Sequence, residues 1–290
     1  MSKSRSAYGV AMMRAMEAFV PKEQRLFDDP VVLELLPATT KFAMRIAWCR
    51  QMFASMVDRQ APGVRGSILC RTRWIDDAVQ DVFHRGIRTF VILGAGFDTR
   101  AYRLPELKQS QVLELDLPGV QAAKRTRLYQ SAIGTSNVRF ISMNFDTLPM
   151  ESAFTASDVA KDQPLCFVWE GVTQYLSPAA VSSVLNYVAN MPAGSEIIFT
   201  YVLEEAITKQ FLPEQNDEFR KAACYQPEPW HFGIDPAHLL TFLENHQLVL
   251  AADVGADNYS AEYLRPCARN LRVSEIERIA RATVSTVSER

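Results

Sequence analysis

Short apolar runs rich in β-branched and aromatic residues alternate with helical stretches in the chain after Gly86. Such alternation is typical of a parallel sheet whose strands are joined by helical crossovers. A later run at 248–253 predicts a further strand. We therefore expect a doubly wound α/β sheet. Five earlier runs predict its parallel strands, at residues 90–93, 112–116, 138–143, 165–169 and 196–203.

The region before this alternation contains no convincing strand, and we expect a helical N-terminal cap over residues 1–86. Apolar residues recur there at helical spacing, and Pro21 ends the first such pattern. Within the later region one crossover helix is clear, because Ser177 and Pro178 stand where an N-cap and a first helical residue belong. The division predicts a cap and a core over 87–290.

Composition excludes several classes of protein. The 290 residues carry a formal net charge of −2, which disfavours a nucleic-acid partner because phosphates require a basic surface. No apolar run is long enough to span a membrane, and the first residues lack the core of a secretory signal. Five scattered cysteines indicate reduced thiols in a cytoplasmic protein, and four scattered histidines predict no metal site. The sequence does not determine the oligomeric state.

The segment from Phe90 to Arg100 carries the clearest chemical signal. An apolar strand runs directly into Gly94 and Gly96, which permit a sharp turn and a close approach of the backbone to a ligand. Plain turns also supply this pattern. Asp116 ends the next strand twenty residues later, where a carboxylate accepts hydrogen bonds from ribose hydroxyls. The alternative for Asp116 is an N-cap of the helix that opens at Pro118.

The residues of this turn discriminate between nucleotides. A nicotinamide or flavin dinucleotide needs room for its pyrophosphate, which a third glycine usually provides. Here Thr99 takes that position, Phe97 crowds the turn, and Asp98 would repel an anion. S-adenosylmethionine has no phosphates and carries cationic sulfonium and ammonium groups. The turn therefore favours S-adenosylmethionine, with Asp98 near the ligand, and an NAD(P)-dependent oxidoreductase is the alternative.

Five segments, in the same order, resemble the leucine carboxyl methyltransferase family. The resemblance implies a class I methyltransferase fold, a Rossmann-like and mostly parallel seven-stranded sheet under an N-terminal helical cap. It also implies S-adenosylmethionine as cofactor, and a final antiparallel strand that residues 273–283 can supply, although their spacing fits a helix equally well. The segments are RTRWIDD from Arg71, LGAGFDTRAYRL from Leu93, LELDLP from Leu113, WEGVTQYL from Trp169 and FGIDP from Phe232.

The resemblance assigns cofactor contacts residue by residue. Arg71 would meet the methionine carboxylate, and it shares an apolar helical face where an unpaired guanidinium is costly to bury. Glu170 would accept from the cofactor's ammonium group. Asn144 stands where the family usually has Asp, but its side-chain oxygen can still accept from the adenine, and nearby Asp146 is a substitute. The full set is Arg71, Gly94, Gly96, Asp116, Asn144, Phe145 and Glu170.

The reaction implied is methyl transfer to an oxygen of a small molecule, either a carboxylate or a hydroxyl. A hydroxyl would need a general base, for which His231 is the candidate, although a structural histidine is the alternative. Tyr175 would border the acceptor or the cofactor. An insertion around residues 205–235 would shape the acceptor pocket, and no motif there identifies the acceptor. A protein that binds S-adenosylmethionine without catalysis is a further alternative.

Overall fold

The computed structural model describes residues 3–155, 162–209 and 229–285. Its centre is one seven-stranded sheet with the strand order β3-β2-β1-β4-β5-β7-β6. All of the predicted strands are confirmed to within a few residues. The strands are β1 (Thr89–Leu93), β2 (Gln111–Asp116), β3 (Val138–Ser142), β4 (Cys166–Trp169), β5 (Glu196–Val202), β6 (Leu248–Val254) and β7 (Glu277–Val284).

Strand direction separates the sheet into two parts. Strands β1 to β5 pair in parallel, with Phe90 opposite Val112 on one side and Cys166 on the other. Strand β7 runs antiparallel between β5 and β6. The C-terminal segment whose spacing fitted either a strand or a helix is therefore a strand. The doubly wound, mostly parallel sheet expected from the sequence is confirmed.

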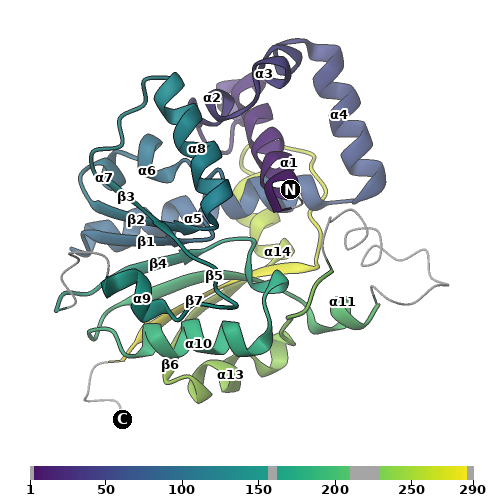
Figure 1. Ribbon diagram of the computed structural model, residues 1–290. Helices are drawn as coiled ribbons and strands as arrows, with labels where there is room; N and C mark the ends of the chain where they lie inside the picture. Colours follow the sequence, from purple (N-terminus) through teal and green to yellow (C-terminus); the bar gives the residue numbers. More distant parts are fainter. Residues whose placement is uncertain (1–2, 156–161, 210–228, 286–290) are drawn as a thin grey trace.

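Helices cover both faces of the sheet (Figure 1). Helix α10 begins as predicted, because the Ser177 hydroxyl accepts from the amide of Ala180 at 3.2 Å and Pro178 follows. The helices are α1 (Lys3–Ala15), α2 (Val32–Leu35), α3 (Ala38–Arg45), α4 (Ala47–Gln60), α5 (Val64–His84), α6 (Arg100–Arg103), α7 (Pro105–Lys108), α8 (Pro118–Gln130), α9 (Met150–Thr155), α10 (Pro178–Ala189), α11 (Glu204–Lys209), α13 (Leu239–Asn245) and α14 (Ala256–Tyr259).

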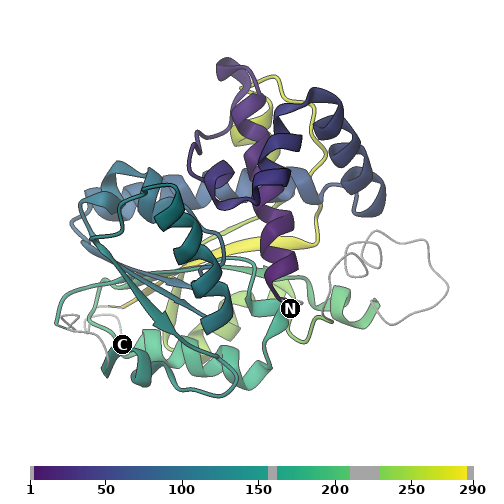
Figure 2. The same ribbon diagram turned by 45° about the horizontal axis from the view of Figure 1, so that its top comes forward.

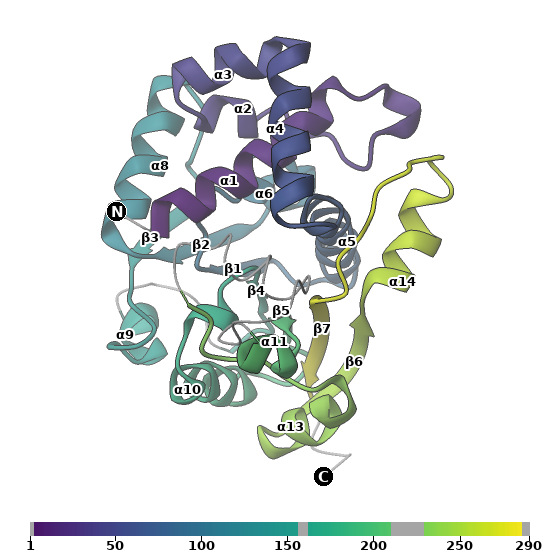
Figure 3. The ribbon, with the colours of Figure 1, turned by 90° about the vertical axis from the view of Figure 1, so that its right-hand side faces the viewer.

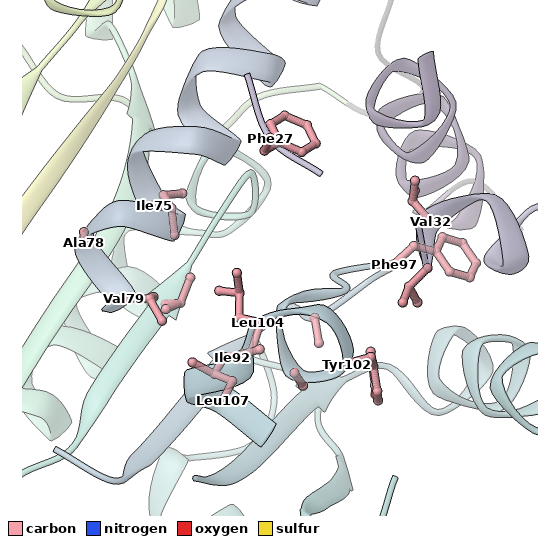
Figure 4. Packing of buried hydrophobic residues seen from close by; sticks show 14 of the residues in the cluster. Phe27, Val32, Ile75, Ala78, Val79, Ile92, Phe97, Tyr102, Leu104 and Leu107 are labelled. Carbon is pink, nitrogen blue, oxygen red and sulfur yellow. The ribbon is translucent and has the colours of Figure 1, made fainter. Parts of the chain in front are cut away.

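Alternate residues of each strand point to opposite faces and build two apolar layers. Phe90 and Ile92 of β1 pack with α5, α7 and α14, whereas Val91 and Leu93 pack with α9, α10 and α13. Figure 4 shows part of the first layer, which includes Ile75 and Val79 of α5 and Ile92 of β1. The strands in the middle of the sheet are buried on both faces, which explains why their sequences read as continuous apolar runs.

The described residues before β1 form helices joined by short turns and loops, and α1 lies between the sheet and the outer helices α2, α3 and α4 (Figure 3). In Figure 2 these helices gather on one side of the sheet and α10 and α13 on the other. The division into a cap (1–86) and a core (87–290) stays a prediction, and most of the expected insertion at 205–235 lies outside the described residues. No helix in the described part is long and apolar enough to cross a membrane.

Candidate functional site

A cavity of about 170 Å³ opens where the carboxyl ends of β1, β2 and β4 meet. The order of the sheet reverses between β1 and β4, and ligands of doubly wound sheets bind at such a switch point. Helix α1 contributes Val10 and Arg14 to the wall of the cavity. The cavity brings together every cofactor residue predicted from the sequence, together with Tyr175. These residues are Arg71, Gly94, Gly96, Asp98, Asp116, Asn144, Phe145 and Glu170.

The turn after β1 requires glycine for two physical reasons. Gly94 has φ = 64° and Gly96 has φ = 41°, in the left-handed region that favours residues without a Cβ atom. A Cβ atom on Gly94 would also overlap Cγ2 of Val172, which follows β4 and faces the turn. The turn therefore lets the backbone lie directly against the floor of the cavity.

Asp116 holds this turn from the neighbouring strand. Its Oδ2 accepts from the amide of Gly96 at 2.6 Å, and its Oδ1 accepts from the amide of Leu117 at 2.6 Å. Helix α8 has Leu117 as its N-cap residue, so the alternative role of Asp116 as that cap is not realised. Each carboxylate oxygen has a second lone pair, which leaves Asp116 able to accept from the hydroxyls of a ribose.

Most of the backbone N–H groups in this turn donate hydrogen bonds within the protein, so few can bind a phosphate. Ala95, Gly96, Asp98 and Arg100 donate their backbone N–H groups to Leu115, Asp116, Ala95 and Asp98 respectively. Nucleotide-binding turns of the pyrophosphate type instead direct such amides at the ligand. The hydrogen bonds of this turn therefore disfavour a dinucleotide. This agrees with the absence of the third glycine, which indicated the same from the sequence.

Asp98 is tied to a buried arginine that follows the turn. Arg100, 1% exposed, donates to Asp98 at 2.5 Å, to Glu170 at 2.7 Å and to Asp76 at 2.8 Å. Burial alone would raise the pKa of Asp98, but the charges of Arg100 and Arg14 lower it below its ordinary value. The same holds for Glu170, whose pKa is lowered by Arg100 and Arg71. Both carboxylates are therefore ionised at neutral pH.

Arg71 meets two carboxylates of the protein itself. Its Nε donates to Glu170 at 2.8 Å, and its Nη1 lies 2.6 and 2.7 Å from the two oxygens of Glu277 on β7. Burial alone would lower the pKa of Arg71, but these carboxylates raise it. The anion required by a buried guanidinium is thus supplied within the chain. A ligand carboxylate would join this cluster rather than neutralise a lone charge.

The remaining predicted residues differ in their placement. The side-chain oxygen of Asn144 accepts from the amide of Asp146 at 3.2 Å, and the ring of Phe145 lies 6.2 Å from that of Trp169. Asp146 is exposed, accepts from Ser177 at 3.3 Å and does not line the cavity. His231 is also exposed and outside the cavity lining, and its backbone amide donates to Gln174. The base role of His231 therefore gains no support from its position.

Three residues of the site were not singled out from the sequence. Arg14 of α1 lines the cavity and bonds Asp29, Thr99 and the carbonyl of Phe97. Arg100 lay within a segment that carried the family resemblance, although no role was assigned to it. Glu277 is 206 residues from Arg71 along the chain, and no local pattern marks it.

Comparisons with known proteins agree with this geometry. Residues 7–189 match the model of the leucine carboxyl methyltransferase family. A protein of Mycobacteroides abscessus named "Putative S-adenosyl-L-methionine-dependent methyltransferase" is 30% identical over 234 residues, which cover 75% of this chain and 72% of that protein. A protein of the same name from Mycobacterium marinum is 32% identical over 195 residues, covering 66% of this chain and 64% of that protein, just under two thirds of its length.

Solved structures share the fold at low sequence identity. A "putative methyltransferase" from Thermobifida fusca superposes with a TM-score of 0.56 at 17% identity, covering 82% of this chain and 89% of that one. A DUF574 family protein from Streptomyces avermitilis gives a TM-score of 0.55 at 14% identity, covering 81% and 90%. At such identities the likeness concerns the fold alone.

Proposed function

The chain belongs to the leucine carboxyl methyltransferase family, and from that premise we propose that it transfers the methyl group of S-adenosylmethionine to an oxygen of a small-molecule acceptor. Its seven-stranded sheet with an antiparallel β7 is the class I methyltransferase fold that the sequence predicted. The transfer to oxygen rather than nitrogen, and the cytoplasmic location, are the finer parts of this proposal.

One observation supports S-adenosylmethionine as the cofactor. The cavity combines three carboxylates with a turn in which most backbone N–H groups donate hydrogen bonds within the protein. Asp98, Asp116 and Glu170 line the cavity together with Arg14 and Arg71, and buried Arg100 pairs with Asp98 and Glu170. Carboxylate oxygens in the wall suit the ammonium and sulfonium groups of a cationic ligand and oppose a pyrophosphate. The nucleoside sulfonium of S-adenosylmethionine meets both conditions, and a dinucleotide meets neither.

Particular residues would hold the parts of the cofactor. Asp116 would accept from the ribose hydroxyls, and Asn144 and Phe145 would border the adenine. Glu170 would accept from the ammonium group, while Arg71 would bind the carboxylate beside it. The glycine turn, held by Asp116, would pack against the nucleoside because no side chain intervenes.

The protein's part in the chemistry is to orient and to exclude water. When bound, the cofactor supplies a methyl group that is already activated by the positive charge on its sulfur. Residues of α1 line one side of the cavity and would limit the access of water to a bound cofactor. Proximity and orientation lower an activation barrier by up to about 7–11 kcal/mol in favourable cases, and this positioning is the role proposed for the walls of the cavity.

Calorimetric titration tests the proposal directly. We expect saturable binding of S-adenosylmethionine and no binding of NAD at the same concentrations. Asp116→Ala should weaken that binding at least about tenfold, the effect of one or two charge-assisted hydrogen bonds. Asp146→Ala removes an exposed carboxylate outside the cavity and serves as the matched control. Binding of NAD without S-adenosylmethionine, or equal effects of the two variants, would contradict the assignment.

Transfer of a labelled methyl group distinguishes an enzyme from a protein that only binds the cofactor. Incubation with methyl-labelled S-adenosylmethionine and mixtures of phenols and carboxylic acids should label an acceptor. Label that stays on the cofactor, with binding intact, would support a non-catalytic role instead.

A further inference from the structure

A second, smaller cavity of about 60 Å³ lies against the first. The two cavities share Val10, Arg71, Gly171 and Tyr175 in their walls. A molecule in the smaller cavity would therefore face the amino-acid end of the proposed cofactor site, where Arg71 and Glu170 lie. This position makes the smaller cavity a candidate for the methyl acceptor.

Most of the wall of the smaller cavity is apolar. The apolar side chains come from five separate parts of the chain, namely α1, α5, β5, the segment that contains Trp230 and the residue that precedes β7. The volume of about 60 Å³ is below the roughly 150 Å³ of a cavity that encloses a whole benzene ring, so part of a compact acceptor would lie in it and the rest would extend toward the adjoining larger cavity. The apolar residues are Val10, Val64, Ile68, Val202, Trp230 and Ile276.

Gln174 provides a polar group without a partner in this wall. Its side chain is only 6% exposed, and its Oε1 atom has no hydrogen-bond partner within the described residues. A buried hydrogen-bond acceptor that is left without a donor costs free energy, and most such acceptors are hydrogen-bonded in native proteins. The Oε1 atom would accept a hydrogen bond from a donor on a bound molecule.

Glu277 lies in the wall of the smaller cavity together with Arg71. Its carboxylate lines the cavity and holds Nη1 of Arg71, while Glu170 holds Nε of the same guanidinium. Both carboxylates thus engage donors of Arg71, and Glu170 is held by Arg100 as well. An acceptor carboxylate would lie beside the Glu277 carboxylate and a guanidinium that is already paired, whereas a hydroxyl can donate to Glu277.

We propose that the smaller cavity binds the methyl acceptor, and that this acceptor is a compact apolar alcohol or phenol with two hydrogen-bond donors. The inference rests on the proposed function. One donor bonds Oε1 of Gln174, and the other is the hydroxyl that receives the methyl group. Glu277, rather than His231, accepts the proton of that hydroxyl.

The proton and the electrons of the step are then accounted for. The hydroxyl oxygen forms the new bond to the methyl carbon, the bond from that carbon to sulfur breaks with its electron pair left on sulfur, and the hydroxyl proton passes to the Glu277 carboxylate. Arg71 holds Glu277 in place and is itself bonded by Glu170.

Matched ring compounds test the binding preference by calorimetry, with S-adenosylhomocysteine present. We expect 1,3-dihydroxybenzene to bind at least about tenfold more tightly than 3-hydroxybenzoate, which differs only in one charged substituent. Gln174→Met, close in shape, should weaken binding of the dihydroxybenzene about tenfold and leave the affinity for S-adenosylhomocysteine unchanged. Gln174→Glu should keep the binding of the dihydroxybenzene and weaken the binding of 3-hydroxybenzoate further. Gln80→Met, on the distant part of α5, is the control.

Glu277→Gln separates binding from turnover. The amide oxygen can still accept a hydrogen bond, so binding of the dihydroxybenzene should stay within about threefold. Methyl transfer to it should fall by about a hundredfold or more, as for loss of a general base. Preference for 3-hydroxybenzoate, no binding of either ring, or unchanged turnover in Glu277→Gln would overturn the inference. Failure to bind S-adenosylhomocysteine would instead overturn the proposed function.

Discussion

Replacing Gly94 with alanine tests whether the turn after β1 is shaped by backbone strain and by contact with Val172. The native φ of 64° places any other residue in the left-handed region, at about 1–2 kcal/mol. The new Cβ atom would overlap Cγ2 of Val172 and lie 3.2 Å from its Cγ1. Val172 lies three residues after the end of β4 and is half-buried, so its side chain would have to shift to make room, and such overpacking costs about 1–3 kcal/mol.

The two effects together predict a loss of about 2–5 kcal/mol in the free energy of unfolding for Gly94→Ala. Urea denaturation measures this loss as a shift in the midpoint with an unchanged slope. Adding Val172→Ala should recover the steric part, so that the double variant is less destabilised than the sum of the two single variants.

Two other glycines supply matched controls. Gly86 has φ = 105° and no atom within 4 Å of an added Cβ, so Gly86→Ala measures backbone strain without a clash. Gly119 lies in helix α8 with open space around it, and Gly119→Ala should stabilise the protein by about 0.5–1 kcal/mol. Equal losses at Gly94 and Gly86, or no recovery in the double variant, would refute the steric argument.

Three further predictions concern the buried charges and one helix cap. Arg100→Met removes a shared ion-pair partner of the carboxylates around it and should lower the unfolding free energy by about 3–5 kcal/mol. Arg65→Met removes one partner of a more exposed ion pair and should cost less than about 1 kcal/mol. Because the pKa of Glu170 is lowered on folding, its ion pairs stabilise the protein above its ordinary pKa of 4.5, and that stability is lost as the pH falls through the lower folded value. The unfolding free energy, measured by denaturation between pH 6 and 3, should therefore depend less on pH in Glu170→Gln than in the native protein. An unaltered pH dependence would contradict this. Ser177→Ala should cost about 1 kcal/mol through loss of the α10 cap, and thermal unfolding without any shift would exclude that role.

The strands could be located from the sequence because local apolar runs and breakers decide where a buried strand begins and ends. The runs at 90–93 and 196–203 correspond closely to β1 and β5. The cavity residues near Gly94, Asp116 and Glu170 were also accessible, because parallel strands bring their carboxyl ends to one edge of the sheet. Their assignment to particular parts of the cofactor stays a prediction.

The ambiguous C-terminal segment shows where local information ends. Its spacing fitted a helix and a strand equally well, and only the open edges of β5 and β6 made it the antiparallel β7. That pairing also delivers Glu277 to Arg71, which no local pattern could indicate.

The sequence by itself determined the alternation of strands and helices and the glycine turn, because these depend on side-chain period and on backbone freedom within a few residues. Only the tertiary structure decided which charges neutralise one another. It showed that Arg71 already meets Glu170 and Glu277, that Asp98 holds Arg100, and that His231 lies outside the cavity. The reason is physical: an ion pair is a property of distance in space, and the partners of Arg71 come from β7 and from the end of β4, far from it along the chain.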